Sequence, residues 1–419
     1  MNNLIKTIYP YYFKFFVLRR NAALQARYVR ELKGKGSVKL SFIVSALSMW
    51  RLQSLYDLLA KDSRFDISIL LYPFASYSKA EQEKSISGLK DFFCSRGIVF
   101  YDLTSTPTPG KYIRETINPD IIFYPQPYHQ LYNNDLDSDF FEDKLICYVH
   151  YSLNIFDEAW VYNQRLTNLA WRVFHASQAD LFCAKKYTYN KGKNVRIVGC
   201  PLADQFIENP RTDPWKPQSS KKKRIIWAPH YSIANNGILQ RSHFLSLSGP
   251  MLNLASTYKD TIQFVFKPHP RLLTELYKNP DWGETKANEY YAQWRDGENT
   301  QLETGAYIDL FLTSDAMIHD CCSFSAEYLY THKPVFYTTR DLNAEKTGLH
   351  ELGRQALDAH YHGLEINDIQ CFIEGVVCSG EDTMHDTRER FFQRFLLPPN
   401  GQSAAMNIYQ DLLSGLRFE

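Results

Sequence analysis

The sequence predicts an α/β protein built from two doubly wound domains that face each other across a cleft. Short apolar runs alternate with helix-length amphipathic stretches, a proline-rich basic segment interrupts this alternation, and the same alternation then resumes. Short apolar runs separated by amphipathic helices are typical of parallel strands joined by crossover helices. The length of 419 residues suits two or three domains of ordinary size.

The first half begins its alternation with VKLSFIVSAL, which reads as a buried strand leading into a helix over residues 49–61. Helices are also expected over residues 79–94 and 158–174, because these stretches are long and amphipathic. The remaining strands of this half are expected at FDISILLY, GIVFYDL, DIIFYP and LICYVHY, and the segments ADLFCAKK and VRIVGCP complete it.

The segment ENPRTDPWKPQSSKKKR separates the halves, because three prolines and a basic run indicate a linker. After it the alternation resumes with the apolar segments RIIWAPHY, TIQFVFKPHP, AYIDLFLTSD, AMIHD and PVFYTT. Helices are expected over residues 241–258, between TIQFVFKPHP and about residue 295, and between AMIHD and PVFYTT. The expected domains are therefore a basic N-terminal segment 1–36, an N-terminal domain 37–207, a linker 208–223, a C-terminal domain 224–395 and a C-terminal helix 396–419.

The composition excludes several classes of protein. Lys plus Arg number 47 and Asp plus Glu 46, so the chain has no excess of positive charge that would attract nucleic acid. We therefore expect no nucleic-acid partner. No run of about 18 apolar residues exists to span a membrane. The eight cysteines form no C-x-x-C pair, and no Gly-rich phosphate or dinucleotide motif occurs, so we expect no metal, no cofactor and a reducing cytoplasm.

The N-terminal 37 residues differ from the rest of the chain. Eight Lys and Arg residues stand there against Glu31 alone, interspersed with large apolar and aromatic residues. That composition is typical of a helix lying in an anionic membrane interface, which would involve residues 1–30. The alternative is the first amphipathic helix of a domain, with its apolar stripe buried on the core.

Candidate site residues cluster at the predicted strand ends, where open α/β sheets present their ligands. YVHYS ends one predicted strand with His150, WAPHYS ends another with His230 after Pro229, and FKPHPR ends a third with Lys267, His269 and Arg271. Imidazoles and fixed cations suit an anionic substrate, with histidine acting as a general base or stabilising phosphate charge. The alternative for each histidine is a structural hydrogen bond.

The segment SDAMIHDCCSFSAEYLYTHKPVFY is the sharpest feature. AMIHD is expected to be a buried strand ending at Asp320, and Ser323 or Ser325 to cap the next helix. Backbone N–H groups at a helix start form an anion site suited to a diphosphate, with Glu327 in reach of a ribose hydroxyl. A capped helix with nothing bound is the alternative.

These motifs resemble the CDP-glycerol glycerophosphotransferases, the family of teichoic-acid primases and polymerases. The segment above is similar to the family pattern SD-x-L-I-T-D-Y-S-S followed by KP-x-x-x-Y, and NGQSAAMNIYQDL is similar to its closing helix. The resemblance runs from about residue 145 to the end. The matching residues are His150, Gly199, Pro201, Asp204, His269, Ser314, Asp315, Asp320, Ser323, Lys333, Pro334 and Tyr337.

The resemblance implies a GT-B fold of two Rossmann-like domains and a peripheral membrane enzyme at the inner face of the bacterial cytoplasmic membrane. Such an enzyme moves glycerol or ribitol phosphate from a CDP-polyol to a hydroxyl of a glycan or lipid-linked acceptor and releases CMP. The catalytic residues would be His150 as base and His269 as stabiliser of the phosphoryl group. The residues expected to bind nucleotide or phosphate are Pro229, His230, Lys267, Arg271, Asp320, Ser323, Phe324, Ser325 and Glu327.

The sequence departs from the family pattern in three places. The family's HGT is His150-Tyr151-Ser152, its DYSS is Asp320-Cys321-Cys322-Ser323, and its Asp is Glu327. Two other functions therefore stay open. One is a GT-B glycosyltransferase using a nucleotide sugar for capsule or lipopolysaccharide assembly, and the other is a non-catalytic protein that binds glycans or membranes.

Overall fold

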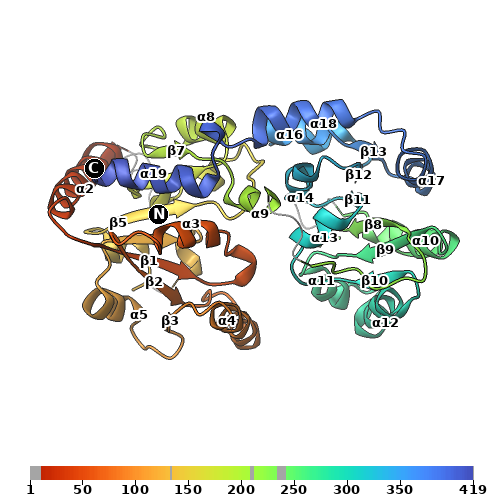
Figure 1. Ribbon diagram of the computed structural model, residues 1–419, viewed down its shortest axis with the longest axis horizontal. Coiled ribbons are helices and arrows are strands. Elements are labelled where there is room, and N and C mark those ends of the chain that lie inside the picture. The colour runs from red at the N-terminus through yellow and green to blue at the C-terminus, as the bar shows by residue number, and fades with distance from the viewer. Residues whose placement is uncertain (1–10, 133–134, 208–211, 234–241, 419) are drawn as a thin grey trace. The chain divides into compact units, whose positions relative to one another are not determined.

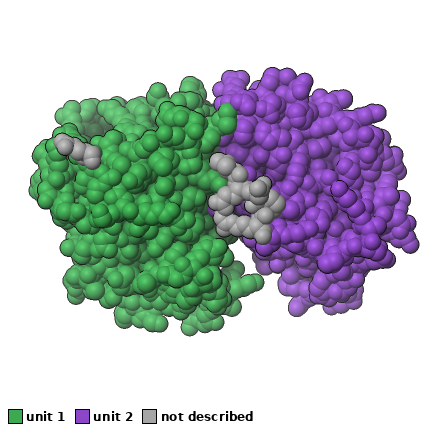
Figure 2. Space-filling model, in the orientation of Figure 1, with its two compact units in different colours: residues 1–204, 397–419 green, residues 205–396 purple. Residues whose placement is uncertain are grey.

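The computed structural model describes residues 11–132, 135–207, 212–233 and 242–418. The chain divides into two compact units, coloured separately in Figure 2: unit 1 comprises residues 1–204 and 397–419, and unit 2 comprises residues 205–396. Residues 1–10 of the expected N-terminal segment and 208–211 of the expected linker lie outside the described residues. The domain boundaries expected from composition stay a prediction.

Unit 1 is built on a seven-stranded parallel sheet with the order β3-β2-β1-β4-β5-β6-β7 (Figure 1). Its central strands are apolar because helices cover both faces, and in β1 only Lys39 is exposed. The strands are β1 (Val38–Val44), β2 (Phe65–Leu71), β3 (Phe100–Asp102), β4 (Ile121–Tyr124), β5 (Leu145–Val149), β6 (Arg172–His175) and β7 (Val195–Ile197).

Most helices of unit 1 lie in the sequence between two consecutive strands, as crossover connections of a parallel sheet do. Helix α4 begins at a capping box, in which Ser78 and Glu81 each satisfy a backbone N–H of the other. The helices are α2 (Leu18–Leu32), α3 (Gln53–Leu59), α4 (Lys79–Cys94), α5 (Pro109–Tyr112), α6 (Ala159–Tyr162), α7 (Arg165–Leu169), α8 (Gln178–Tyr187) and α19 (Ala404–Leu416).

The last helix, α19, belongs to unit 1 although it is far from it in sequence (Figure 1). The carboxylate of Asp204 accepts hydrogen bonds from the N–H groups of Ala404 and Ala405, both at 2.9 Å, and so caps the helix. Asp411 pairs with Arg172 at 2.7 Å and with Arg196 at 3.0 Å. The apolar face of α19 is buried in the same core as β1 and β2.

Unit 2 is built on a six-stranded parallel sheet with the order β10-β9-β8-β11-β12-β13. Its strands are β8 (Lys223–Ala228), β9 (Ile262–Phe266), β10 (Thr300–Leu302), β11 (Ala316–His319), β12 (Val335–Thr338) and β13 (Tyr361–Gly363). Its helices are α9 (Asp204–Ile207, from the boundary), α10 (Phe244–Thr257), α11 (Leu272–Lys278), α12 (Gly283–Asp296), α13 (Ile308–Thr313), α14 (Phe324–Glu327), α15 (Leu342–Lys346), α16 (Glu351–Asp358), α17 (Ile366–Cys371) and α18 (His385–Phe391).

The predicted α/β class with two Rossmann-like sheets is confirmed, since the strand order 3-2-1-4-5-6 occurs in both units. One expected element is wrong: residues 158–174 do not form one helix but α6, α7 and the start of β6. Residues 172–174 pair with β5, so pairing in the sheet overrides the helical pattern. The three-residue strands β10 and β13 were too short to show an apolar run.

Residues 11–32 pack on unit 1 as its first helix. Helix α2 follows the π-helical turn η1 (Phe13–Val17), in which Phe13 is 2% exposed. The side chains of Asn21 and Gln25 donate to the carbonyl of Leu169 at 2.8 and 2.7 Å. These contacts match the alternative interpretation of the N-terminal segment, the first helix of a domain.

Candidate functional site

The sheet of unit 2 reverses its strand order between β8 and β11, and its candidate site lies at the carboxyl ends of these strands. Ala228 of β8 pairs with His319 of β11, so the residues that follow are neighbours. Asp320 accepts hydrogen bonds from the backbone N–H groups of His230 at 2.5 Å and His243 at 2.8 Å. This carboxylate therefore joins β11 to the end of β8 and to the start of α10.

Asp320 is 2% exposed, and burial raises its pKa to about 7, although the two backbone N–H groups oppose this shift. Sequence reasoning placed Asp320 among the nucleotide- or phosphate-binding residues. In the structure its carboxylate oxygens are occupied by protein N–H groups, which indicates a positioning role.

His230 and His269 lie side by side, with ring centroids 5.1 Å apart. Tyr231 packs against both, 4.3 Å from the His230 ring and 4.5 Å from the His269 ring. Arg271 lies over the Tyr231 ring at 4.3 Å, a cation–π contact. Strand ends that are separate in the sequence thus form one cluster of imidazole, phenol and guanidinium groups.

The tautomer of His269 follows from its hydrogen bond. The backbone N–H of Arg271 donates to Nδ1 at 3.2 Å, so Nδ1 carries the lone pair and Nε2 carries the hydrogen. In His230, Nδ1 lies 3.3 Å from the Ser232 backbone nitrogen and 2.8 Å from the Ser232 hydroxyl, and both groups can donate to it. These contacts favour an Nε2–H donor on both imidazoles, as an oxyanion requires.

Burial and neighbouring charges disfavour the protonated form of His269. Burial, together with the charges of Arg271 and Lys267, lowers the pKa of His269 to about 4. Lys267 is 6% exposed, donates to the carbonyl of Gly305 at 2.8 Å, and has its pKa lowered by burial. An incoming phosphate would supply the negative charge that this cluster lacks.

The residues after Asp320 are placed as follows. Ser323 stands at the start of α14, without a side-chain cap bond, and α14 is only four residues long. Ser325 is 1% exposed. Glu327 is equally buried and accepts a hydrogen bond from Tyr307 at 2.7 Å. The ring of Phe324 lies 5.2 Å from that of Tyr307. The role of this loop in holding a diphosphate and ribose stays a prediction.

In unit 1, His150 follows β5 at the carboxyl edge of the sheet. Its Nδ1 lies 2.7 Å from the carbonyl oxygen of Ser152, 3.3 Å from the Ser152 backbone nitrogen and 3.5 Å from the Ser152 hydroxyl. The shortest contact is to the carbonyl, which only accepts, and it favours the tautomer with the hydrogen on Nδ1 and the lone pair on Nε2. A cavity of about 20 Å³ beside His150 is also lined by Ser45 and Trp50. Among the described residues, the buried Ser45 hydroxyl has no hydrogen-bond partner.

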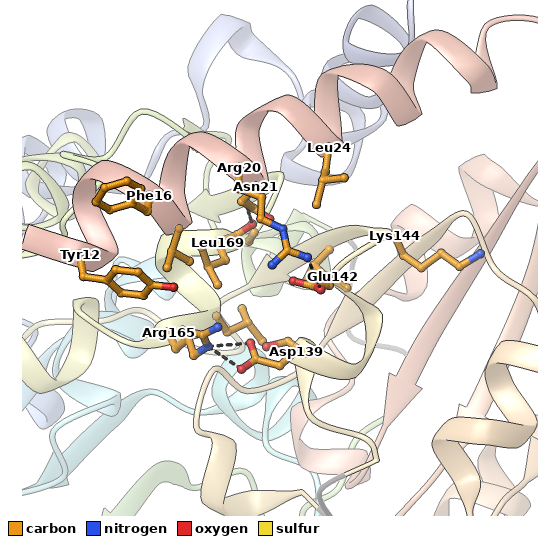
Figure 3. A pocket seen from close by; sticks show the side chains of 15 residues that line it. Tyr12, Phe16, Arg20, Asn21, Leu24, Asp139, Glu142, Lys144, Arg165 and Leu169 are labelled. Atoms are coloured by element: carbon orange, nitrogen blue, oxygen red, sulfur yellow. Dashed lines mark hydrogen bonds and ion pairs between the residues drawn. The ribbon is translucent and has the colours of Figure 1, made fainter. Parts of the chain in front are cut away.

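A second hollow in unit 1, of about 250 Å³, lies under the N-terminal helix (Figure 3). The ion pairs Arg20–Glu142 at 2.9 Å and Arg165–Asp139 at 2.5 Å lie along it. The rings of Tyr12 and Phe16 stack 5.6 Å apart at its margin and are 54% and 66% exposed. Arg20 and Arg165 are paired with carboxylates at the hollow, Lys144 donates to the amide oxygen of Asn118, and the rings of Tyr12 and Phe16 are exposed.

Sequence reasoning missed three residues of the unit 2 site. Tyr231 packs on the two histidines, Tyr307 binds Glu327, and His243 donates its N–H to Asp320. Tyr231 was visible as the neighbour of His230. Tyr307 and His243 were not, because their contacts join segments 20 and 77 residues apart.

Across the described ranges, no group of three or more His, Cys, Asp or Glu side chains is placed to hold a metal ion. Over the same part of the chain, no helix is both long and apolar enough to cross a membrane.

Comparison with known proteins finds a family model that matches part of the chain. Residues 172–352 match the family model described as CDP-Glycerol:Poly(glycerophosphate) glycerophosphotransferase. The resemblance seen in the sequence is confirmed. The chain is a transferase of the CDP-glycerol glycerophosphotransferase type. No curated protein sequence matches it.

Solved structures share the fold of this transferase at low sequence identity. The wall teichoic acid polymerase TagF is 12% identical with a TM-score of 0.61, covering 98% of this chain and 97% of its own. MnaA of S. aureus with UDP is 16% identical, with a TM-score of 0.55 and coverage of 91% and 98%. The UDP-GlcNAc 2-epimerase of Neisseria meningitidis, bound to UDP-GlcNAc, is 14% identical, with a TM-score of 0.56 and coverage of 90% and 100%.

Proposed function

We propose that the transferase moves glycerol or ribitol phosphate from a CDP-polyol to a hydroxyl of a glycan or lipid-linked acceptor in teichoic-acid-like synthesis, and releases CMP. The observation that carries the proposal is the different main-chain contacts of the two histidines: the close Ser152 carbonyl at Nδ1 of His150 favours a proton-accepting Nε2, and the Arg271 N–H at Nδ1 of His269 favours a donating Nε2–H. The family match and a TagF structure soaked with CDPG support a CDP-polyol donor.

In this reaction the acceptor oxygen forms a bond to the β-phosphorus while the bond from that phosphorus to the CMP oxygen breaks. His150 takes the proton of the acceptor hydroxyl at Nε2. His269 donates Nε2–H to the phosphoryl oxygen, where negative charge develops. Positioning and charge stabilisation supply most of the rate in phosphoryl transfer, so these two groups suit the step.

The remaining unit 2 residues hold the donor in this proposal. Lys267 and Arg271 supply positive charge, and His230 supplies a second Nε2–H donor next to His269. Ser323 and the N–H groups after it hold the diphosphate, and Glu327 holds the ribose. Bound diphosphate would raise the pKa of His269 toward its ordinary value, because a nearby anion favours imidazolium.

The test is incubation of the purified chain with CDP-glycerol, CDP-ribitol and a panel of UDP-, GDP- and CMP-sugars, with the released nucleotide identified by chromatography. We expect CMP from a CDP-polyol. Release of UDP or GDP from a sugar nucleotide instead would favour the glycosyltransferase alternative, which the fold shared with UDP-bound proteins supports. If no donor is consumed, the non-catalytic alternative holds.

We also propose that the N-terminal region attaches the protein to the inner face of the bacterial cytoplasmic membrane. Tyr11, Tyr12, Phe15 and Phe16 are 46–66% exposed, and Lys14 and Arg19 lie near the Phe15 ring. Exposed aromatic rings beside cations suit an anionic lipid surface.

The membrane proposal is tested with the variant Phe15→Ser/Phe16→Ser, which changes only exposed rings. We expect it to lose sedimentation with vesicles of phosphatidylglycerol, while Phe182→Ser, equally exposed on α8, keeps it. Equal sedimentation of both variants would contradict the proposal.

A further inference from the structure

Aromatic side chains gather at the carboxyl edge of the unit 1 sheet. Tyr128 follows β4 and Trp160 lies in α6, and their rings stack with centroids 6.2 Å apart and an interplanar angle of 29°. Phe156 lies 6.5 Å from Trp160. The Trp160 side chain is 57% exposed. Tryptophan usually buries most of its surface, so a ring this exposed leaves an aromatic face open to a ligand.

Tyr151 connects this pair to the candidate base. Its ring stacks on the imidazole of His150 at 5.4 Å with an interplanar angle of 10°. Tyr128 and Tyr151 follow the carboxyl ends of the neighbouring strands β4 and β5, which pair at Tyr124 and Tyr148, so both residues lie at the same edge of the sheet. We name Tyr128, Tyr151 and Trp160 the aromatic platform.

The charges around the aromatic platform suit a neutral ligand better than a phosphate polymer. Arg51 lines the small cavity that His150 and Tyr151 also line. The segments that carry the platform, residues 125–132 and 151–162, contain no Lys or Arg, and Asp157 and Glu158 directly precede α6. The ammonium of Lys186 is paired with Asp157 at 3.0 Å. Binding of phosphodiesters depends on Lys and Arg, so one arginine beside these carboxylates offers little to a polyanionic chain.

We propose that the aromatic platform binds a neutral pyranose ring, the terminal sugar of the acceptor, and presents one of its hydroxyl groups to His150. The face of an aromatic ring carries partial negative charge, which attracts the polarised C–H bonds of a sugar face. The glycine of the family's HGT pattern is Tyr151 here, and this residue supplies the ring next to the base. The assignment of the acceptor rests on the proposed function.

Binding is tested without donor, so its outcome is independent of catalysis. Saturation-transfer NMR is recorded with the full chain and three probes: N-acetylglucosamine, methyl glucoside and a glycerol-phosphate tetramer. We expect saturation of the ring protons of at least one sugar, reduced about fivefold or more in Trp160→Ala and Tyr128→Ala. Phe182→Ala, a matched exposed aromatic in the same unit, should leave it unchanged.

The kinetic readout follows the acceptor rather than the donor. With a sugar-terminated acceptor, Trp160→Ala should raise the acceptor KM about tenfold and leave the donor KM unchanged. Equal sugar binding in wild type and Trp160→Ala, or binding of the glycerol-phosphate tetramer in place of sugars, overturns the proposal that the aromatic platform binds a sugar. Sugar binding lost in Trp160→Ala, with no CDP-polyol consumed by any variant, would overturn the proposed function and keep the aromatic platform.

Discussion

The two sheets share one strand order but end in different chemistry. The carboxyl edge of unit 1 presents aromatic rings and a histidine whose Nδ1–H is held by a carbonyl. The same edge of unit 2 presents Lys267 and Arg271 beside histidines whose Nδ1 atoms accept backbone N–H groups. The difference teaches that the groups of the residue two positions later bias the tautomer of a histidine: a carbonyl close to Nδ1 favours a proton-accepting Nε2, and an N–H favours a proton-donating one.

The strongest test of this comparison removes each histidine separately. His150→Ala and His269→Ala should each lower kcat about 10³-fold, because each removes a proton-transferring or charge-stabilising group. CMP release measures the loss, and circular dichroism provides the control for folding. His230→Ala should have a smaller effect than His269→Ala. Undiminished turnover in His150→Ala would show that unit 1 supplies no base.

The second test concerns the carboxylate that joins the strand ends of unit 2. Asp320→Ala leaves two buried N–H groups without an acceptor, so the free energy of unfolding should fall by about 3 kcal/mol. Urea unfolding measures this change. Asp315→Ala, at the opposite end of β11, loses a hydrogen bond to Arg224 N–H and serves as the less buried comparison. A smaller loss for Asp320→Ala than for Asp315→Ala would contradict its positioning role.

The third test uses pH. The pKa of His269 is lowered from 6.5 to about 4 in the folded state, so the unfolded chain binds more protons between these values. Stability should therefore rise with pH from 4 to 6.5, and His269 should contribute about 2 kcal/mol of that rise. Thermal melts of wild type and His269→Gln across this window measure the difference. Identical slopes would mean that the imidazole is not desolvated.

The smallest expected effect lies in unit 1. Asp204→Ala removes the side chain that caps α19, which should cost about 1 kcal/mol. Asp204→Asn should retain part of the cap, since one amide oxygen still accepts. Denaturant unfolding of both variants separates the cap from general effects of losing a buried charge. If Asp204→Ala lowered the free energy of unfolding more than Asp320→Ala does, the expected order of the two effects would be wrong.

The sequence predicted the fold and the positions of the candidate site residues. It did not predict which atoms of these residues donate or accept protons. Apolar runs such as VKLSFIV revealed most strands, because a parallel sheet is buried on both faces. The strand β6 was missed because its pairing with β5 is not a local property. The histidines were visible at strand ends, but their tautomers depend on hydrogen-bond geometry. Asp320 matched a family pattern, yet its burial and its two N–H donors appear only in three dimensions.

The cap that Asp204 places on α19 has a consequence for synthesis of the chain. The core of unit 1 includes Ile408, Leu412 and Leu416, which are translated after the whole of unit 2. Unit 2, residues 205–396, is continuous and leaves the ribosome before unit 1 has all its parts. Residues 1–204 therefore keep part of their apolar surface uncovered until α19 has been synthesised. Premature termination after residue 396 would release a chain with a finished second unit and an unfinished first one.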